Sequence, residues 1–137
     1  MEEKNLLNLL QTRAEFSSFM KLFKAAELEA LLSDGETRLT LFAPNDQALQ
    51  LLPDQTLARL LDDKEELGRI LRYHIVDGIL TAAELTSYSE LATLEGDDLT
   101  VEKNSSDKIL INDAEVLTPD IEASNGIIHE IDRVLVR

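Results

Sequence analysis

Few side chains in this sequence could act as a base near neutral pH: the two histidines are His74 and His129, far apart in the chain. Cysteine is absent, which removes thiolate nucleophiles, disulfides and zinc–thiolate sites together. No serine lies in a G-x-S-x-G pattern, and the five glycines are scattered, so hydrolase elbows and phosphate-binding loops are both missing. The sequence therefore predicts a protein that is not an enzyme and has no catalytic residues.

Metal binding is also weakly indicated, because the sequence has neither an H-x-x-x-H pair nor a calcium loop of alternating acids. The acids at 95–98, or Asp113 with Glu115, could hold a loosely bound cation, but acidic residues in turns usually face water. We expect neither a metal site nor a cofactor.

Each histidine also has a structural explanation. His74 falls on one helical face with Leu67, which favours a hydrogen-bonded position in or near the core. His129 alternates with Ile127 on one face of a predicted strand, and Ile128 lies on the other face, which we expect to be wetter.

Composition predicts one soluble domain over residues 1–137, with 44% apolar and 29% charged residues. The net charge of −14 disfavours nucleic acid and anionic lipid as partners and favours a soluble monomer. No apolar run is long enough for a transmembrane helix. The first residues do not form a signal peptide, so either a leader has been trimmed, which we expect, or the protein never leaves the cytoplasm.

The elements that must position these side chains change type along the chain. Apolar residues recur at helical spacing over 6–32, and a short strand over 38–43 ends at Pro44. Further helices are predicted after Asn45 or Asp46, after Pro53, and after Asp62 or Asp63.

Beyond Gly78 the pattern favours short strands, mostly antiparallel. Asn125-Gly126 is typical of a two-residue hairpin with positive φ at both central positions. The predicted strands cover 91–94, 99–103, 109–111, 115–117, 121–124 and 127–131, with an edge strand at 134–136.

Three segments resemble the signatures of the fasciclin domain family. Residues 40–49, TLFAPNDQAL, are similar to T-x-F-A-P-T-D-x-A-F and depart from it at Asn45 and Leu49. Tyr73-His74 is similar to the family's tyrosine–histidine motif, and residues 125–135, NGIIHEIDRVL, are similar to its closing signature. The signature residues, to which the resemblance gives a structural role, are Thr40, Phe42, Ala43, Pro44, Asp46, Asn125, Gly126, His129 and Asp132.

The resemblance implies an α+β fold: a wedge-shaped β-sandwich with helices packed around it, helices mainly in the N-terminal half and antiparallel strands in the C-terminal half. It also implies a non-enzymatic adhesion module that is secreted, periplasmic or at the cell surface. Its partner would be a cell-surface or matrix protein or a polysaccharide.

Two partner-binding segments are carried over from animal members of the family. One comprises Tyr73, His74 and Ile75; the other comprises Pro119, Asp120 and Ile121. The residues that flank the second segment depart from the family's pattern, and Asp120 is equally well explained as a turn residue.

An alternative function is the carriage of an apolar small molecule, such as a carotenoid or a lipid, in a surface groove. Some members of the family bind such pigments, and a stripe at helical spacing (Phe16, Phe19, Met20 and Phe23) could line a pocket. Such stripes are more often core. The low aromatic content of 4% also argues against a clamp for a polyene.

Overall fold

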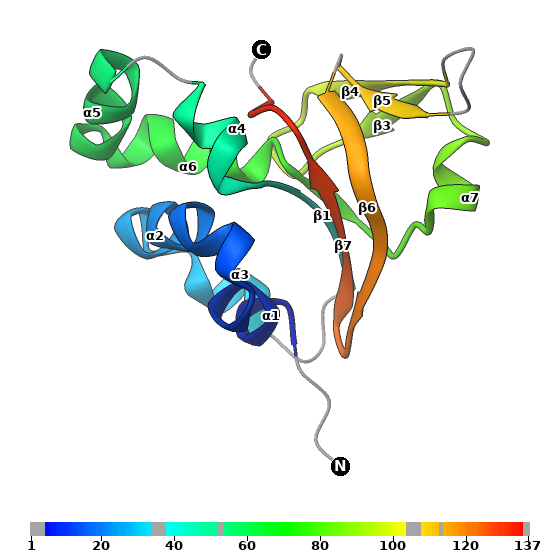
Figure 1. Ribbon diagram of the computed structural model, residues 1–137, viewed down its shortest axis with the longest axis horizontal. Coiled ribbons are helices and arrows are strands. Elements are labelled where there is room, and N and C mark those ends of the chain that lie inside the picture. Colours follow the sequence, from blue (N-terminus) through cyan, green and yellow to red (C-terminus); the bar gives the residue numbers. More distant parts are fainter. Residues whose placement is uncertain (1–4, 34–37, 52–53, 104–107, 113, 136–137) are drawn as a thin grey trace.

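The computed structural model describes residues 5–33, 38–51, 54–103, 108–112 and 114–135. Helices dominate the first half of the chain and strands the second (Figure 1), as predicted for this α+β protein. The helical segments are α1 (Leu6–Thr12), η1 (Ala14–Phe16), α2 (Ser17–Ala26), α3 (Glu29–Ser33), α4 (Asp46–Gln50), α5 (Asp54–Asp62), α6 (Lys64–Arg72) and α7 (Ala82–Leu85). The strands are β1 (Leu39–Pro44), β2 (Ile75–Asp77), β3 (Glu90–Ala92), β4 (Asp98–Lys103), β5 (Ile109–Ile111), β6 (Ala114–Ala123) and β7 (Gly126–Ile131).

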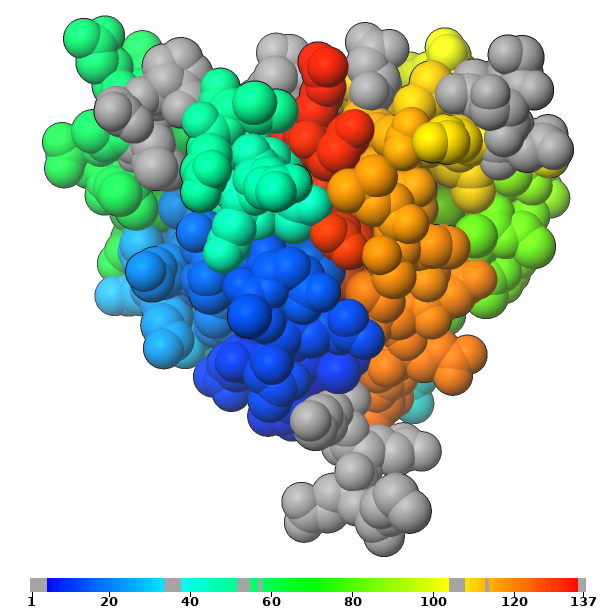
Figure 2. Space-filling model, viewed as in Figure 1, coloured from blue at the N-terminus to red at the C-terminus, as the bar shows by residue number. Residues whose placement is uncertain are grey.

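The strands form one seven-stranded sheet in the order β2-β1-β7-β6-β5-β4-β3. Neighbouring strands are antiparallel except β1 and β7, which run parallel. The two ends of the sheet approach each other, because Val76 bridges to Thr93 and the Leu94 N–H donates to the Ile75 carbonyl at 2.9 Å. The expected sandwich is therefore a single sheet curved nearly into a barrel. The molecule as a whole narrows toward the β6–β7 hairpin (Figure 2).

Two apolar clusters fill the interior, one on each face of the sheet. The larger lies between the helices and the sheet and contains the phenylalanine stripe, in which Phe16, Phe19, Met20 and Phe23 are all buried. The smaller lies within the curve of the sheet around Phe42. The stripe is thus core, as its spacing favoured.

Helices α4 and α6 begin with the side-chain caps that the sequence predicted, and the structure shows which of the two candidate residues caps each helix. The Asn45 side chain caps α4 by accepting from the Ala48 N–H at 2.8 Å, and Asp63 caps α6 by accepting from the Glu66 N–H at 3.1 Å. Asn45 and Asp63, rather than Asp46 and Asp62, are the N-caps.

The β6–β7 hairpin corrects one prediction. β6 ends at Ala123 and β7 begins at Gly126, so the central residues of the turn are Ser124 and Asn125. Neither Asn125 nor Gly126 has a positive φ. Gly126 is required for a different reason: a Cβ there would overlap the Leu39 carbonyl oxygen where β7 pairs with β1.

The strands also differ from prediction at three places. The segments predicted at 115–117 and 121–124 form one strand, β6, interrupted by register shifts on either side of Thr118. Ile128 is buried in the larger apolar cluster, so the prediction of a wetter face is wrong at this residue; Glu130 and Asp132, which alternate with it, are half-buried as that prediction has them. Val134 and Leu135 form no edge strand; Val136 lies outside the described residues.

Candidate functional site

The first predicted segment, Tyr73-His74-Ile75, lies inside the molecule. Tyr73 is 5% exposed, and His74 and Ile75 are fully buried. The Tyr73 hydroxyl donates to the Asp98 carbonyl at 3.2 Å and accepts from the Asn112 side-chain amide at 2.8 Å. These side chains therefore hold the end of α6 and strand β2 in place, and they do not form an outer surface.

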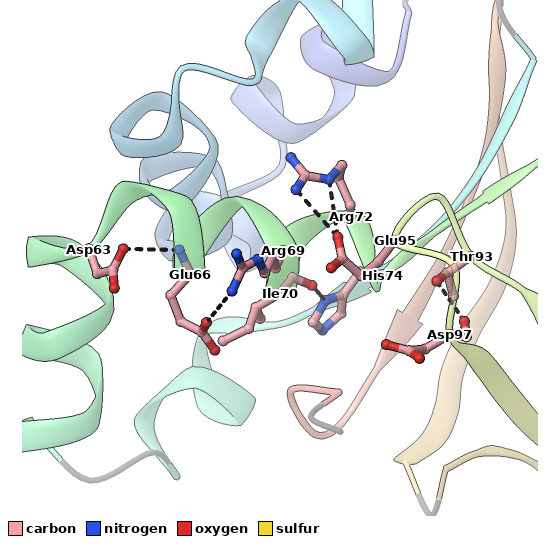
Figure 3. A network of polar contacts seen from close by, with 9 residues as sticks. All are labelled: Asp63, Glu66, Arg69, Ile70, Arg72, His74, Thr93, Glu95 and Asp97. Atoms are coloured by element: carbon pink, nitrogen blue, oxygen red, sulfur yellow. Dashed lines mark hydrogen bonds and ion pairs between the residues drawn. The ribbon is translucent and has the colours of Figure 1, made fainter.

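His74 connects three parts of the chain. Its Nδ1–H donates to the Ile70 carbonyl at 2.7 Å (Figure 3), and its Nε2 accepts from the Leu135 N–H at 2.9 Å. The ring lies 5.6 Å from that of Phe19, centroid to centroid. Burial lowers the pKa of His74 from 6.5 to about 4, so the imidazole is neutral at pH 7. Because the neutral ring uses both nitrogens in hydrogen bonds to the backbone, its role is to hold these segments together.

His129 and Thr40, two of the signature residues, hold the segment that follows β2. The Thr40 hydroxyl donates to the Gly78 carbonyl at 2.7 Å and accepts from the Leu80 N–H at 2.8 Å. His129 Nε2–H donates to the Leu80 carbonyl at 2.7 Å, and burial lowers the pKa of this histidine too. Gly78 and Leu80 are thereby held against β1 and β7.

Asp120 joins this segment to the second predicted site. Pro119 and Asp120 together oppose His129, which makes a β-bulge in β6. The Asp120 N–H donates to His129 Nδ1 at 3.1 Å, and its carboxylate accepts from the Ala82 N–H at 2.8 Å. Asp120 has a φ of 58°, a left-handed conformation that aspartate tolerates better than most residues. This geometry is therefore compatible with both interpretations of Asp120, as a turn residue and as a binding residue on the surface.

The bulge and the segment after β2 expose several apolar side chains. Ile79 is 39% exposed and Leu117 is 44% exposed, while Pro119 and Asp120 are also on the surface and Ile121 is buried. We call residues 78–82 and 117–120 the bulge surface. Sequence reasoning missed Ile79 and Leu117; for Ile79 the available signal was the glycine at position 78, where the chain turns away from β2 with a positive φ.

The other signature residues act inside the fold. The Phe42 ring stacks on His129 with centroids 5.7 Å apart, and the Asp46 carboxylate accepts from both the hydroxyl of Ser17 and the N–H of Ser18 at 2.9 Å. Asp132 accepts from the Glu115 N–H at 2.8 Å.

Asn125 has the most far-reaching contacts of the closing signature. Its side-chain oxygen accepts from the Leu6 N–H at 2.9 Å, and its amide donates to the Leu32 carbonyl at 2.8 Å. It therefore ties the turn of the hairpin to the start of α1 and the end of α3.

Within the described ranges no group of three or more histidine or acidic side chains is arranged to hold a metal ion. A hollow of about 440 Å³ lies between α2 and α6, and charged side chains of α6 form much of its wall. Such a lining does not favour an apolar ligand. Of the described helices, none is long and apolar enough to cross a bilayer.

A model of the fasciclin domain family matches residues 14–137. This chain belongs to the fasciclin domain family. The chain is 43% identical over 124 residues to protein sll1483 of Synechocystis, covering 88% of this chain and 67% of that protein. It is 33% identical over 133 residues to transforming growth factor-beta-induced protein ig-h3 of pig, covering 96% of this chain but 19% of that protein.

Solved structures agree on the fold. The chain resembles a FAS1 domain pair from the insect cell adhesion molecule Fasciclin I with a TM-score of 0.80 and 25% identity, over 98% of this chain and 51% of that one.

A cell surface glycolipoprotein of Mycobacterium bovis, MPB83, is also similar in sequence. It is 32% identical over 116 residues, which are 85% of this chain and 50% of that protein. The fasciclin relatives thus include adhesion and cell-surface proteins, and the family is generally non-enzymatic.

Proposed function

We propose that this fasciclin domain, residues 1–137, is a non-enzymatic adhesion module that binds a cell-surface or matrix protein outside the cell through the bulge surface. The observation that carries the proposal is the anchoring of residues 78–82. Thr40, His129 and Asp120 bind this segment from three adjacent strands, so exposed apolar side chains stand on a rigid support. A rigid surface loses little conformational entropy when it binds a partner.

The two predicted partner-binding segments have different roles in this proposal. Pro119 and Asp120 contact the partner directly, whereas Tyr73, His74 and Ile75 support the surface from within, because β2 leads into the segment that Asp120 holds. Ile121 is buried and anchors the bulge from the core side.

The proposal is tested by coating beads with the protein and measuring how many remain on cells of the natural host under flow. Ile79→Ser and Asp120→Asn are the informative variants, since the amide of asparagine retains an acceptor for the Ala82 N–H and tolerates a positive φ. Leu51→Ser is the matched control, because Leu51 is 69% exposed at the end of α4, away from the bulge surface.

We expect Ile79→Ser and Asp120→Asn to reduce retention and Leu51→Ser to leave it unchanged. Retention equal to that of beads coated with an unrelated acidic protein would refute the adhesion function. Retention lost equally in all three variants would refute the bulge surface as the contact.

A further inference from the structure

Asn125 is the one asparagine in the sequence that is followed by a glycine. In such a pair the backbone nitrogen of glycine can attack the side-chain carbonyl carbon of asparagine, because glycine has no Cβ to shield it and its backbone rotates freely. The new N–C bond closes a succinimide, while the bond from that carbon to the side-chain nitrogen breaks and ammonia leaves with the proton of the glycine N–H. Water then opens the succinimide to aspartate or isoaspartate.

The native fold holds both reacting groups in place. Asn125 is 1% exposed. Its side-chain amide, the group that must leave, donates to the Leu32 carbonyl at 2.8 Å, and its side-chain oxygen accepts from the Leu6 N–H at 2.9 Å. The peptide group that contains the attacking nitrogen of Gly126 is fixed as well, because its carbonyl accepts from the Leu39 N–H at 3.2 Å. The folded domain therefore protects this pair.

Helix α1 supplies the part of this protection that can open. It has seven residues, fewer than an isolated helix needs to be stable in water. Its fully buried side chains Leu6 and Leu10 hold it in the larger apolar cluster, beside the β6–β7 hairpin (Figure 1). A short element of this kind opens at a lower free energy than the whole domain.

The departure of α1 would uncover both members of the pair. Leu6 donates its N–H to Asn125, and its Cδ1 would lie 3.0 Å from a Cβ on Gly126, so the same residue covers the two reacting groups. Without Leu6, the Asn125 side chain loses one of its hydrogen bonds and gains water and freedom to rotate.

We propose that Asn125-Gly126 is a latent deamidation site, which reacts when α1 leaves the domain and then keeps α1 from returning. Aspartate at position 125 has no N–H for the Leu32 carbonyl, so a buried carboxylate oxygen would face that carbonyl oxygen, which is costly. Isoaspartate also lengthens the backbone of the turn that sets the register of β6 on β7. The modification thus makes a reversible opening permanent, and it does not depend on the bulge surface.

The test follows conversion at Asn125 by peptide mass spectrometry in mildly alkaline buffer, in the folded chain and in the same chain unfolded in urea. We expect conversion to be at least about tenfold slower in the folded chain. Leu10→Ala should accelerate conversion in the folded chain at least about tenfold, because truncation of a buried leucine in α1 weakens its packing by that much or more.

Leu99→Ala is the matched control. It truncates an equally buried leucine in β4, in the smaller apolar cluster, and should leave the rate unchanged because α1 is untouched. Rates are compared at a temperature at which circular dichroism shows every variant folded. If Leu10→Ala does not fold, Leu7→Ala is the milder variant, since Leu7 is a partly buried residue of α1 that packs against the same cluster.

Asn125→Asp makes one product directly. Hydrogen exchange of this variant should show that the amides of α1 lose protection while those of β4 keep it. No conversion in the unfolded chain, equal rates in the folded and unfolded chains, no acceleration by the α1 variant, or equal acceleration by Leu99→Ala would overturn the proposal. Full protection of α1 in Asn125→Asp would overturn the step that keeps α1 from returning.

Discussion

Acid should unfold this protein through His74, the residue that ties α6, β2 and the C-terminal segment together. Its Nδ1–H donates to the Ile70 carbonyl and its Nε2 accepts from the Leu135 N–H. A proton on Nε2 would point one donor at another and place a charge beside Phe19 in the core. Burial accordingly lowers the pKa of His74 from 6.5 to about 4.

The size of the effect follows from these two values. The unfolded chain binds a proton at His74 as the pH falls below 6.5, while the folded protein does so only near 4. Between them the unfolded state holds more protons, so the free energy of unfolding decreases as the pH falls, by about 1.4 kcal/mol per pH unit. Over the whole interval the loss is about 3 kcal/mol, a large part of the stability of a small domain. Burial also lowers the pKa of His129, which adds to the loss with the same sign.

Urea unfolding between about pH 7 and pH 5 measures this dependence, and the NMR titration of the histidine ring protons measures the pKa in the folded state. His74→Gln is the control, because glutamine carries a donor and an acceptor but does not titrate, so its stability should depend less on pH. A ring of His74 that titrates near 6.5 in the folded protein, or a free energy of unfolding that is constant over this interval, would refute the reasoning.

Two substitutions test the backbone positions that the structure makes unusual. Gly126→Ala should lower the free energy of unfolding by about 2 kcal/mol or more, since the new methyl group overlaps the Leu39 carbonyl oxygen and meets Leu6 Cδ1 at 3.0 Å. Urea unfolding measures this change, and an unchanged midpoint would contradict the prediction by showing that β1 and β7 can move apart. Glu27→Gly should raise the free energy of unfolding by about 0.5–1 kcal/mol, because glycine relieves the left-handed backbone at the cost of one exposed ion pair. Thermal unfolding measures this change, and a lower midpoint would mean that the pair with Lys64 outweighs the strain.

The sequence predicted the elements well where a local signal sets them. The helix cap predicted at Asn45 or Asp46 and the helical spacing of the phenylalanine stripe depend on residues within a few positions of each other, and both are confirmed, with Asn45 as the cap. The parallel pairing of β1 with β7 joins segments far apart in the sequence, and no local pattern specifies it. Ile128 is buried where alternation favoured a wet face because it packs in the larger apolar cluster beside β1, while Glu130 on the same face of β7 stays half-buried.

The hairpin prediction failed for a related reason. Asn-Gly pairs favour a turn with positive φ at both residues, which is a local preference. Here Asn125 is needed for its side chain, which reaches Leu6 and Leu32, and Gly126 for the close approach of Leu39. Tertiary contacts therefore shifted the turn by one residue while the same two residue types were retained.

The candidate site, too, was predictable only in part from the sequence. Resemblance pointed to Tyr73-His74 and to Asp120, and the structure places the first inside the molecule and the second on its surface. Neither local spacing nor resemblance indicated that Thr40, His129 and Asp120 would all bind one segment, because their common partner, residues 78–82, contributes backbone groups that carry no sequence signal.

This distribution of polar contacts bears on where specificity lies in the domain. Thr40, His129 and Asn125 are buried signature residues, and each hydrogen-bonds to the backbone of a distant segment. Backbone groups are the same whatever side chain is attached, so these ties tolerate change in the exposed residues beside them. Ile79 can therefore vary without loss of the support beneath it. A partner-specific surface in this fold is best sought at such exposed positions, which the signatures hold in place without fixing their identity.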